Sequence, residues 1–104
     1  MEIRTLINAA TGNTTGDALR LDTRRQTLGA IVVHVFGTFT ATGSIQGTIA
    51  TQQEVDEGTA VWSTICGATW TQASVDALFI APTHIRGVVS GWSAGTSITI
   101  KVLV

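Results

Sequence analysis

The chain has 104 residues, which is enough for one domain with a hydrophobic core of its own. Hydrophobic residues make up 44% of the chain, charged residues only 12%, and the formal net charge is −1. Nucleic-acid binding would need a clustered excess of Lys and Arg, and the six basic residues here are matched by seven acidic ones. The single Pro and 11 Gly fit strands joined by tight turns better than disorder. We therefore expect a globular domain whose neutral polar surface meets other protein.

The single cysteine, Cys66, has no partner for an intrachain disulfide, so we expect a protein made in a reducing cytoplasm. Cysteine is among the residue types most often buried, and we expect Cys66 to be buried and inert. The sequence does not open with a charged segment followed by an apolar run, and no apolar stretch approaches the roughly 20 residues that span a bilayer. We expect neither a signal peptide nor a membrane segment.

The beginning of the chain is less regular than the remainder. Ile3, Leu6 and Ile7 make it mostly apolar, and this segment either pairs with a sheet or reaches onto a neighbouring molecule. Ordering such a segment against a groove in a partner costs entropy but gives a firm attachment. We therefore divide the chain into an N-terminal arm over residues 1–16 and a β-domain over residues 17–104.

A loop is predicted over residues 11–16 from its Thr, Gly and Asn content, and a short strand over residues 18–22. Three arginines, Arg20, Arg24 and Arg25, gather near the turn that follows. Such a group is more typical of a solvated loop or of interface ion pairs than of a nucleic-acid site. Arg24 and Arg25 are therefore candidate interface residues.

Residues 30–39 show the alternation of a strand that is largely apolar on both faces. One face holds Ile31, Val33 and Val35, and the other holds Val32, His34 and Phe36. A strand of this kind is either central in a sheet or covered by a partner subunit. Gly37 within the run predicts a bulge or a close approach of two backbones.

Further strands are predicted over residues 44–53, 60–65, 70–73, 77–80 and 84–90. The C-terminus is the clearest case, because Ile98, Ile100 and Val102 alternate with polar residues after a turn at Gly95. No window shows the 3.6-residue apolar period of a helix. Seven or eight strands at these spacings predict an all-β fold, a two-sheet antiparallel β-sandwich.

Three acidic residues, Glu54, Asp56 and Glu57, lie in a predicted turn over residues 54–58. Carboxylate oxygens are ligands that Ca²⁺ accepts, and a second loop would have to complete such a site. The spacing does not match the 12-residue calcium loop, and a surface turn is the ordinary place for these residues. We therefore predict that the protein has no metal site. The alternative is a Ca²⁺ site that these three carboxylates form together with a second loop.

Catalytic groups are sparse in this sequence. A cysteine–histidine nucleophile pair would need Cys66 together with His34 or His84, both of which lie in predicted strands. The sequence contains no Ser-His-Asp motif, no phosphate-binding glycine loop and no paired-carboxylate signal. We expect neither an enzyme nor a cofactor.

The chain has three tryptophans and no tyrosine. Trp62 lies in a predicted strand, where packing in the core is expected. Trp92 lies in a predicted loop over residues 91–95, where a large aromatic ring is harder to bury locally. Because tryptophan is enriched at binding hot spots, we predict that Trp92 anchors a subunit contact, with a sugar-stacking platform as the competing interpretation.

The order of several features from residue 30 onward matches a known pattern. A strand ends in Gly37-Thr38-Phe39, and an acidic turn with a glycine precedes a tryptophan over residues 56–62. An aromatic–Pro–Ile-Arg–Val segment over residues 78–89 then precedes a last strand rich in Thr and Ser. In this order the chain resembles the small β-sandwich structural proteins of tailed bacteriophage virions, which include head decoration (cement) proteins and neck, tail and fibre components.

The resemblance implies a jelly-roll-like sandwich that forms a homo-oligomer, most often a trimer, without enzyme activity. Such a protein is made in the host cytoplasm and becomes part of the virion. There it binds the major capsid protein of the assembled shell, or other virion proteins, and stabilises the assembly. The alternatives are a neck, tail or fibre component, or a glycan-binding β-sandwich module. The candidate interface residues are Ile3, Leu6, Ile7, Arg24, Arg25 and Trp92.

Overall fold

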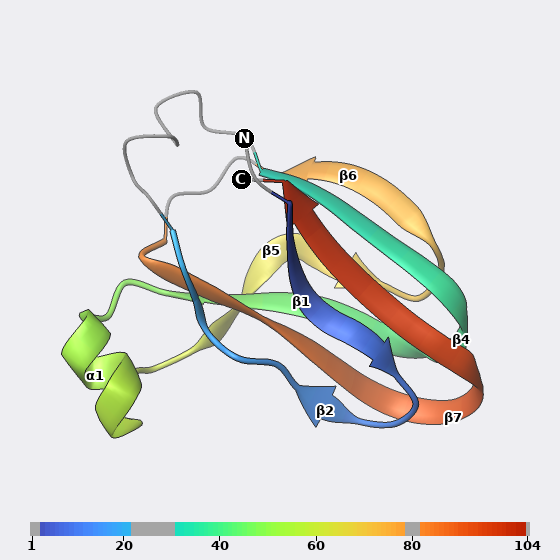
Figure 1. Ribbon diagram of the computed structural model, residues 1–104, viewed down its shortest axis with the longest axis horizontal. Helices are drawn as coiled ribbons and strands as arrows, with labels where there is room; N and C mark the ends of the chain where they lie inside the picture. The colour runs from blue at the N-terminus through green and yellow to red at the C-terminus, as the bar shows by residue number, and fades with distance from the viewer. Residues whose placement is uncertain (1–2, 22–30, 79–81, 104) are drawn as a thin grey trace.

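The computed structural model describes residues 3–21, 31–78 and 82–103, which form a single antiparallel sheet and one short helix (Figure 1). The all-β prediction is confirmed. The described elements are β1 (Ile3–Ala10), β2 (Thr14–Thr15), β3 (Leu19–Arg20), β4 (Ile31–Thr48), α1 (Gln52–Glu57), β5 (Ser63–Trp70), β6 (Ser74–Leu78) and β7 (His84–Leu103).

Two very long strands, β4 and β7, form the centre of this sheet. They pair antiparallel along nearly their whole lengths, from Val32 opposite Leu103 to Thr48 opposite His84. The strand order is β1-β7-β4-β5, with β2 and β3 also paired to β7 and β6 also paired to β4. The separate strands that we expected over residues 30–39 and 44–53 are therefore one strand, and β7 likewise joins the two strands expected on either side of residues 91–95.

Both long strands turn back on themselves halfway along, at the right-hand edge of Figure 1. Gly37 in β4 and Gly95 in β7 have φ angles of 123° and 122°, a region that side chains strongly disfavour. A Cβ atom on Gly95 would also clash with the backbone of Thr38 and Phe39. The predicted loop over residues 91–95 is thus wrong, because these residues continue β7 through the bend.

The two strands follow paths of different length around this bend. From Thr40 to Thr42 β4 advances two residues, whereas β7 advances four, from Ala94 to Ser90. Extra residues on one strand of an antiparallel pair bend it and increase its twist. Gly37 itself pairs in register with Ile98, and a Cβ atom there would clash with the backbone of Ser97, so of the two predicted alternatives it is the close approach of two backbones that occurs. The register shifts follow at Thr38–Phe39 and Thr40–Thr42.

The bend divides the sheet into two half-sheets that pack face to face. The first half-sheet contains β1, β6, the beginning of β4 and the end of β7, and the second contains β2, β3, β5, the end of β4 and the beginning of β7. A Cβ atom on Gly43 of the second would lie 3.0 Å from Ile98 Cδ1 and 3.3 Å from Ile100 Cδ1 of the first. The structure thus has one folded sheet where two separate sheets were expected.

The hydrophobic core lies between the half-sheets and consists mainly of β-branched aliphatic side chains. Burying each such side chain contributes about 1.5–3 kcal/mol to stability. The largest fully buried residues are Ile31, Val33, Val35, Ile45, Ile85, Ile98, Ile100 and Val102. The alternation grouped Ile31, Val33 and Val35 on one face of β4, which is the buried one, and it predicted the buried face of the end of β7 correctly.

The N-terminal segment is part of this sheet, since β1 pairs with the end of β7 from Ile3 opposite Leu103 to Ala10 opposite Ile98. Leu6 and Ile7 are buried in the core, at 7% and 3% exposure. Gly87 makes room for them, because a Cβ atom there would lie 2.7 Å from Ile7 Cγ1. Of the two alternatives for the arm, the described residues adopt the first, and pair with the sheet of their own chain.

A helix, α1, replaces the end of the strand expected over residues 44–53 and the turn expected over 54–58. Thr51 and Glu54 form a capping box, in which each side chain bonds to the backbone of the other residue. Gly58 ends the helix in the left-handed conformation, with φ of 74°. None of its residues is buried, and no helix in the described ranges is long and apolar enough to cross a membrane.

The remaining strands differ from the prediction mainly in their limits. β5 runs from Ser63 to Trp70 and so joins the strands expected over residues 60–65 and 70–73. β6 covers Ser74 to Leu78 rather than residues 77–80, whose last two residues lie outside the described part of the chain. Short strands bounded by polar residues are the elements whose ends a sequence pattern defines least well.

Candidate functional site

The solvent side of the first half-sheet is apolar, and we call it the apolar face. Cross-strand pairing places side chains from four adjacent strands on it: Ile3 lies opposite Leu103, Leu103 opposite Val32, and Val32 opposite Ala77. A second row contains Thr5, Lys101, His34 and Val75. Phe36 follows on β4. Within the part of the chain that the structure describes, the second face of this strand, over residues 32–36, therefore lies on the outer side of the sheet.

Several apolar side chains on this face have no cover within the described structure. Ile3 is 69% exposed and Val75 is 62% exposed, whereas Val32, Phe36 and Leu103 are half-buried. Phe36 lies between two polar neighbours: its ring centroid is 4.8 Å from that of His34 and 5.7 Å from Lys101 Nζ. A contiguous exposed apolar patch with a polar rim is typical of a protein contact surface.

The solvent side of the second half-sheet is polar, and we call it the polar face. Thr64, Gln46 and Arg86 are neighbours on adjacent strands, and Arg86 Nε donates a 2.8 Å hydrogen bond to Gln46 Oε1. Thr69 of β5 is exposed on the same side, whereas its cross-strand partner Ser44 is buried at 8% exposure and Val88 of β7 is half-buried. The two half-sheets therefore share one core but present opposite chemistry to solvent.

The predicted interface residues occupy very different positions. Ile3 belongs to the apolar face, whereas Leu6 and Ile7 are buried in the core of their own chain and are not available at its surface. Trp92 is half-buried and packs against the core, and its backbone N–H donates to Asn13 Oδ1 at 2.8 Å. Arg24 and Arg25 lie outside the described residues.

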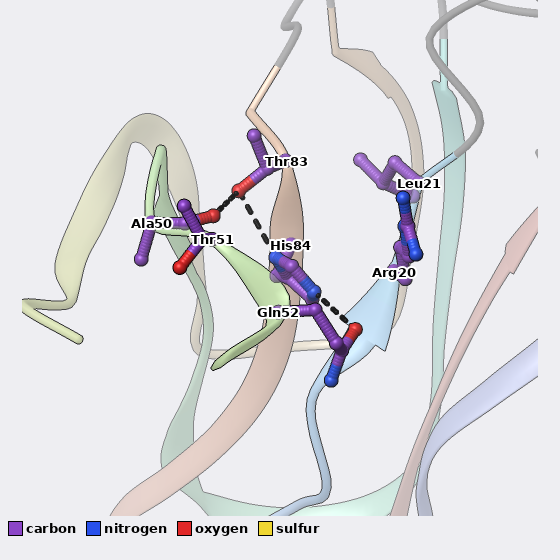
Figure 2. Close-up of a pocket in the computed structure, with 7 residues that line it drawn as sticks. All are labelled: Arg20, Leu21, Ala50, Thr51, Gln52, Thr83 and His84. Carbon is purple, nitrogen blue, oxygen red and sulfur yellow. Dashed lines mark hydrogen bonds between the residues drawn. The ribbon is translucent and has the colours of Figure 1, made fainter. Parts of the chain in front are cut away.

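A pocket of about 600 Å³ lies where the end of β4, α1, β3 and the start of β7 meet (Figure 2). His84 is buried at 2% exposure, and its Nε2 lies 2.9 Å from Gln52 Oε1. The Thr83 hydroxyl donates to the Ala50 carbonyl at 2.7 Å and lies 3.0 Å from His84 Nδ1. These contacts hold α1 and the end of β4 against β7.

The electrostatics of this pocket favour the neutral imidazole. Burial lowers the pKa of His84 below its ordinary value of 6.5, and the positive charge of Arg20 lowers it further, while Asp56 acts in the opposite direction. The Thr83 hydroxyl is bonded to a backbone carbonyl rather than activated by a base. The geometry is therefore that of a structural histidine that joins three segments.

The candidate catalytic and metal residues are not brought together. Cys66 is exposed on β5, contrary to the expectation of burial, and no hydrogen bond in the described ranges joins it to a histidine. Asp56 and Glu57 accept hydrogen bonds from Gln52 and Gln53 along α1. Glu54 serves the helix cap, and no group of three potential metal ligands occurs among the described residues.

Trp62 is outside the core in which we expected it to pack. It is half-buried beside the polar face, and the Arg86 guanidinium carbon lies 4.4 Å from the centroid of its ring. A pocket of about 440 Å³ adjoins this pair, and we call it the Trp62 groove. No residue pattern around Trp62 indicated this position, because its partner Arg86 lies 24 residues away.

Comparison with known proteins adds no relative, since no protein-family model, curated protein or solved structure matches the chain.

Proposed function

We propose that this protein is a structural component of a tailed bacteriophage virion, a head decoration protein that binds the assembled capsid as a homo-oligomer. The observation that carries the proposal is the apolar face. It offers side chains from β1, β7, β4 and β6 in register, which is the arrangement that a flat protein contact requires. The order of sequence features from residue 30 onward supports the same class.

A second copy of the chain is the partner that suits the apolar face. The two cross-strand rows of this face contain one formal charge, that of Lys101. Its Nζ lies 5.7 Å from the centroid of the Phe36 ring, and its flexible stem can carry the ammonium group toward water in a contact between copies. An obligate contact between copies is typically more apolar than a contact between transient partners. A trimer, with a jelly-roll-like sandwich as the protomer, is the form that the resemblance implies.

Capsid binding would then use surfaces that oligomerisation leaves free, such as the polar face. Neutral hydroxyl and amide groups such as those of Thr64, Gln46 and Thr69 suit the wet, polar contacts of a reversible interface. A protein that binds only the assembled lattice stabilises that lattice by mass action. The proposed role therefore needs binding and no chemistry.

Light scattering after size-exclusion chromatography tests the homo-oligomer. The unmodified protein should elute as an oligomer, and Val75→Glu should dissociate it because a charge is placed on the apolar face. Thr69→Glu is the matched control, since it adds the same charge to an exposed position of the polar face. A protein that is monomeric at all concentrations, or one that Val75→Glu and Thr69→Glu affect equally, contradicts the proposal.

The location is tested on virions of the virus that encodes the protein. Gold-labelled antibody against this chain should mark the head, and the protein should co-sediment with assembled shells but not with unassembled major capsid protein. Label confined to the tail or neck would assign the protein to the alternative structural class. Absence from purified virions would overturn a structural role altogether.

A further inference from the structure

We propose that the Trp62 groove is a carbohydrate site that takes a neutral hexopyranose, such as a terminal sugar of a surface glycan. The groove lies between the connection from β2 to β3 and the segment that follows α1, with Arg86 of β7 alongside. Its volume of about 440 Å³ falls within the range of small-ligand sites. This inference does not depend on the proposed virion role.

Trp62 and Arg86 provide a preorganised pair of binding groups. The guanidinium is fixed twice, by its 4.4 Å stack on the indole ring and by the 2.8 Å hydrogen bond from Nε to Gln46 Oε1. Neither Nη atom of Arg86 has a hydrogen-bond acceptor within the ranges that the structure describes. A rigid donor pair beside an aromatic ring loses little entropy when a ligand binds.

Asp17 supplies the acceptor that such a donor pair lacks. Its carboxylate is exposed and lines the same groove, and no donor among the described residues bonds to it. Gly58 also lines the groove, and no atom lies within 4 Å of the position that a Cβ atom would take there. The lining therefore combines an aromatic ring, a fixed donor pair and a carboxyl group around one space.

This combination matches the surface of a hexopyranose. The C–H groups on one side of the sugar ring pack on an aromatic side chain, and vicinal hydroxyls both donate to a carboxylate and accept from a guanidinium. An acidic sugar suits the groove less well, because its carboxylate would approach that of Asp17. A nucleic acid would need more positive charge than the single Arg86 of this groove supplies.

Trp92, the tryptophan for which the sequence suggested sugar stacking, lacks these features. It packs against the hydrophobic core, and Asn13 bonds to its backbone rather than standing free beside its ring. The structure therefore moves the aromatic platform from Trp92 to Trp62. Because both are half-buried tryptophans, Trp92 provides a matched control for substitution.

Saturation-transfer NMR with the methyl glycosides of glucose, galactose and mannose tests the site, with methyl glucuronide as the acidic comparison. We expect at least one neutral glycoside to receive saturation from the protein. Asp17→Asn should weaken its binding roughly tenfold by removing a charged acceptor. Trp62→Ala should weaken it by about tenfold or more, and Trp92→Phe should leave it unchanged.

Three results would overturn the carbohydrate site: no saturation of any neutral glycoside, binding of the glucuronide alone, or equal binding by the unmodified protein and Asp17→Asn. Asp17 is exposed, so this variant decides the matter even if Trp62→Ala fails to fold. The oligomeric state of Asp17→Asn, measured by light scattering, should equal that of the unmodified protein. Loss of sugar binding and loss of oligomerisation are thereby separate outcomes.

Discussion

The two outer faces of this sheet are formed by the same two strands, β4 and β7, yet they differ completely in chemistry. On the first half-sheet β4 turns Val32, His34 and Phe36 outward. On the second half-sheet it turns out Gln46, which lies opposite Thr64 and Arg86. Both halves turn β-branched residues inward to one core. The fold therefore depends on the alternation that places apolar residues on the inner faces. The residues of the outer faces can differ, so each outer face can make a different kind of contact.

The bend in β4 and β7 separates the two outer faces. A substitution that prevents this bend should lower the free energy of unfolding more than a substitution elsewhere in the core. Gly95→Val would force a side chain into the backbone of Thr38 and Phe39 at a φ of 122°. We expect a loss on the order of 5 kcal/mol in the free energy of unfolding, measured by denaturant titration. Gly12→Val is the control, because no atom lies within 4 Å of its Cβ position. Equal stability of both variants would contradict the proposed role of the bend.

A substitution at the contact between the half-sheets should have the next largest effect on the free energy of unfolding. Ile100→Ala removes a fully buried side chain that packs toward Gly43 of the other half-sheet. We expect a loss of roughly 3 kcal/mol, because a cavity is left between two layers that cannot collapse freely. Ile49→Ala, at a position that is 86% exposed, should change the free energy of unfolding by less than about 0.5 kcal/mol.

His84 links α1 to the second half-sheet and should make stability depend on pH. Its pKa is lowered in the folded state by burial and by Arg20, against the smaller opposite effect of Asp56. The unfolded chain therefore binds the proton more readily, so stability is complete above pH 6.5 and falls as the pH drops toward the folded pKa. His84→Gln should cost about 1 kcal/mol at neutral pH and remove this dependence, as thermal unfolding from pH 5 to pH 8 would show. An unchanged pH profile in the variant would assign the dependence to another group.

Asp76, on β6 of the first half-sheet, should have a smaller influence on the pH dependence of stability than His84. Its carboxylate accepts hydrogen bonds from Trp70 Nε1–H and from the Ser74 hydroxyl, which lower its pKa below 3.8. Its contribution to stability is therefore present above pH 3.8 and is lost as the pH falls from there toward the folded pKa. Asp76→Asn should reduce the loss of stability with falling pH, and only in that pH range. Acid unfolding followed through Trp fluorescence measures this loss. A change confined to pH 5–8 would contradict this assignment.

The periodicity of the sequence predicted the inner faces better than the ends or connections of the strands. Alternation placed Val33 and Val35 on one face of their strand and Ile98 and Ile100 on one face of theirs, because a period of two residues follows directly from strand geometry. The helix α1 was missed although Thr51, Glu54 and Gly58 carry its cap signals. Six residues are too few to show a helical period, so only the caps could have revealed it.

The candidate sites were the least predictable part of the molecule. Trp62 was expected in the core and Trp92 at a surface loop, whereas Trp62 stacks on Arg86 beside the polar face and Trp92 packs against the core. The apolar arm residues Leu6 and Ile7 turned out to complete the core of their own chain. Each of these positions depends on contacts between residues far apart in the sequence, which a local pattern does not encode.

The sequence by itself determined the fold class and the apolar character of both sides of residues 30–39. Alternation shows which residues share a face, but it does not show which face is covered or where a strand bends. Gly37 and Gly95 are examples of this limit. A glycine permits a turn, a bulge or a bend within a continuous strand, so the residue type alone does not distinguish these three structures. Only the tertiary structure, through the pairing of β4 with β7, decided that the outer side of residues 32–36 is an open apolar face.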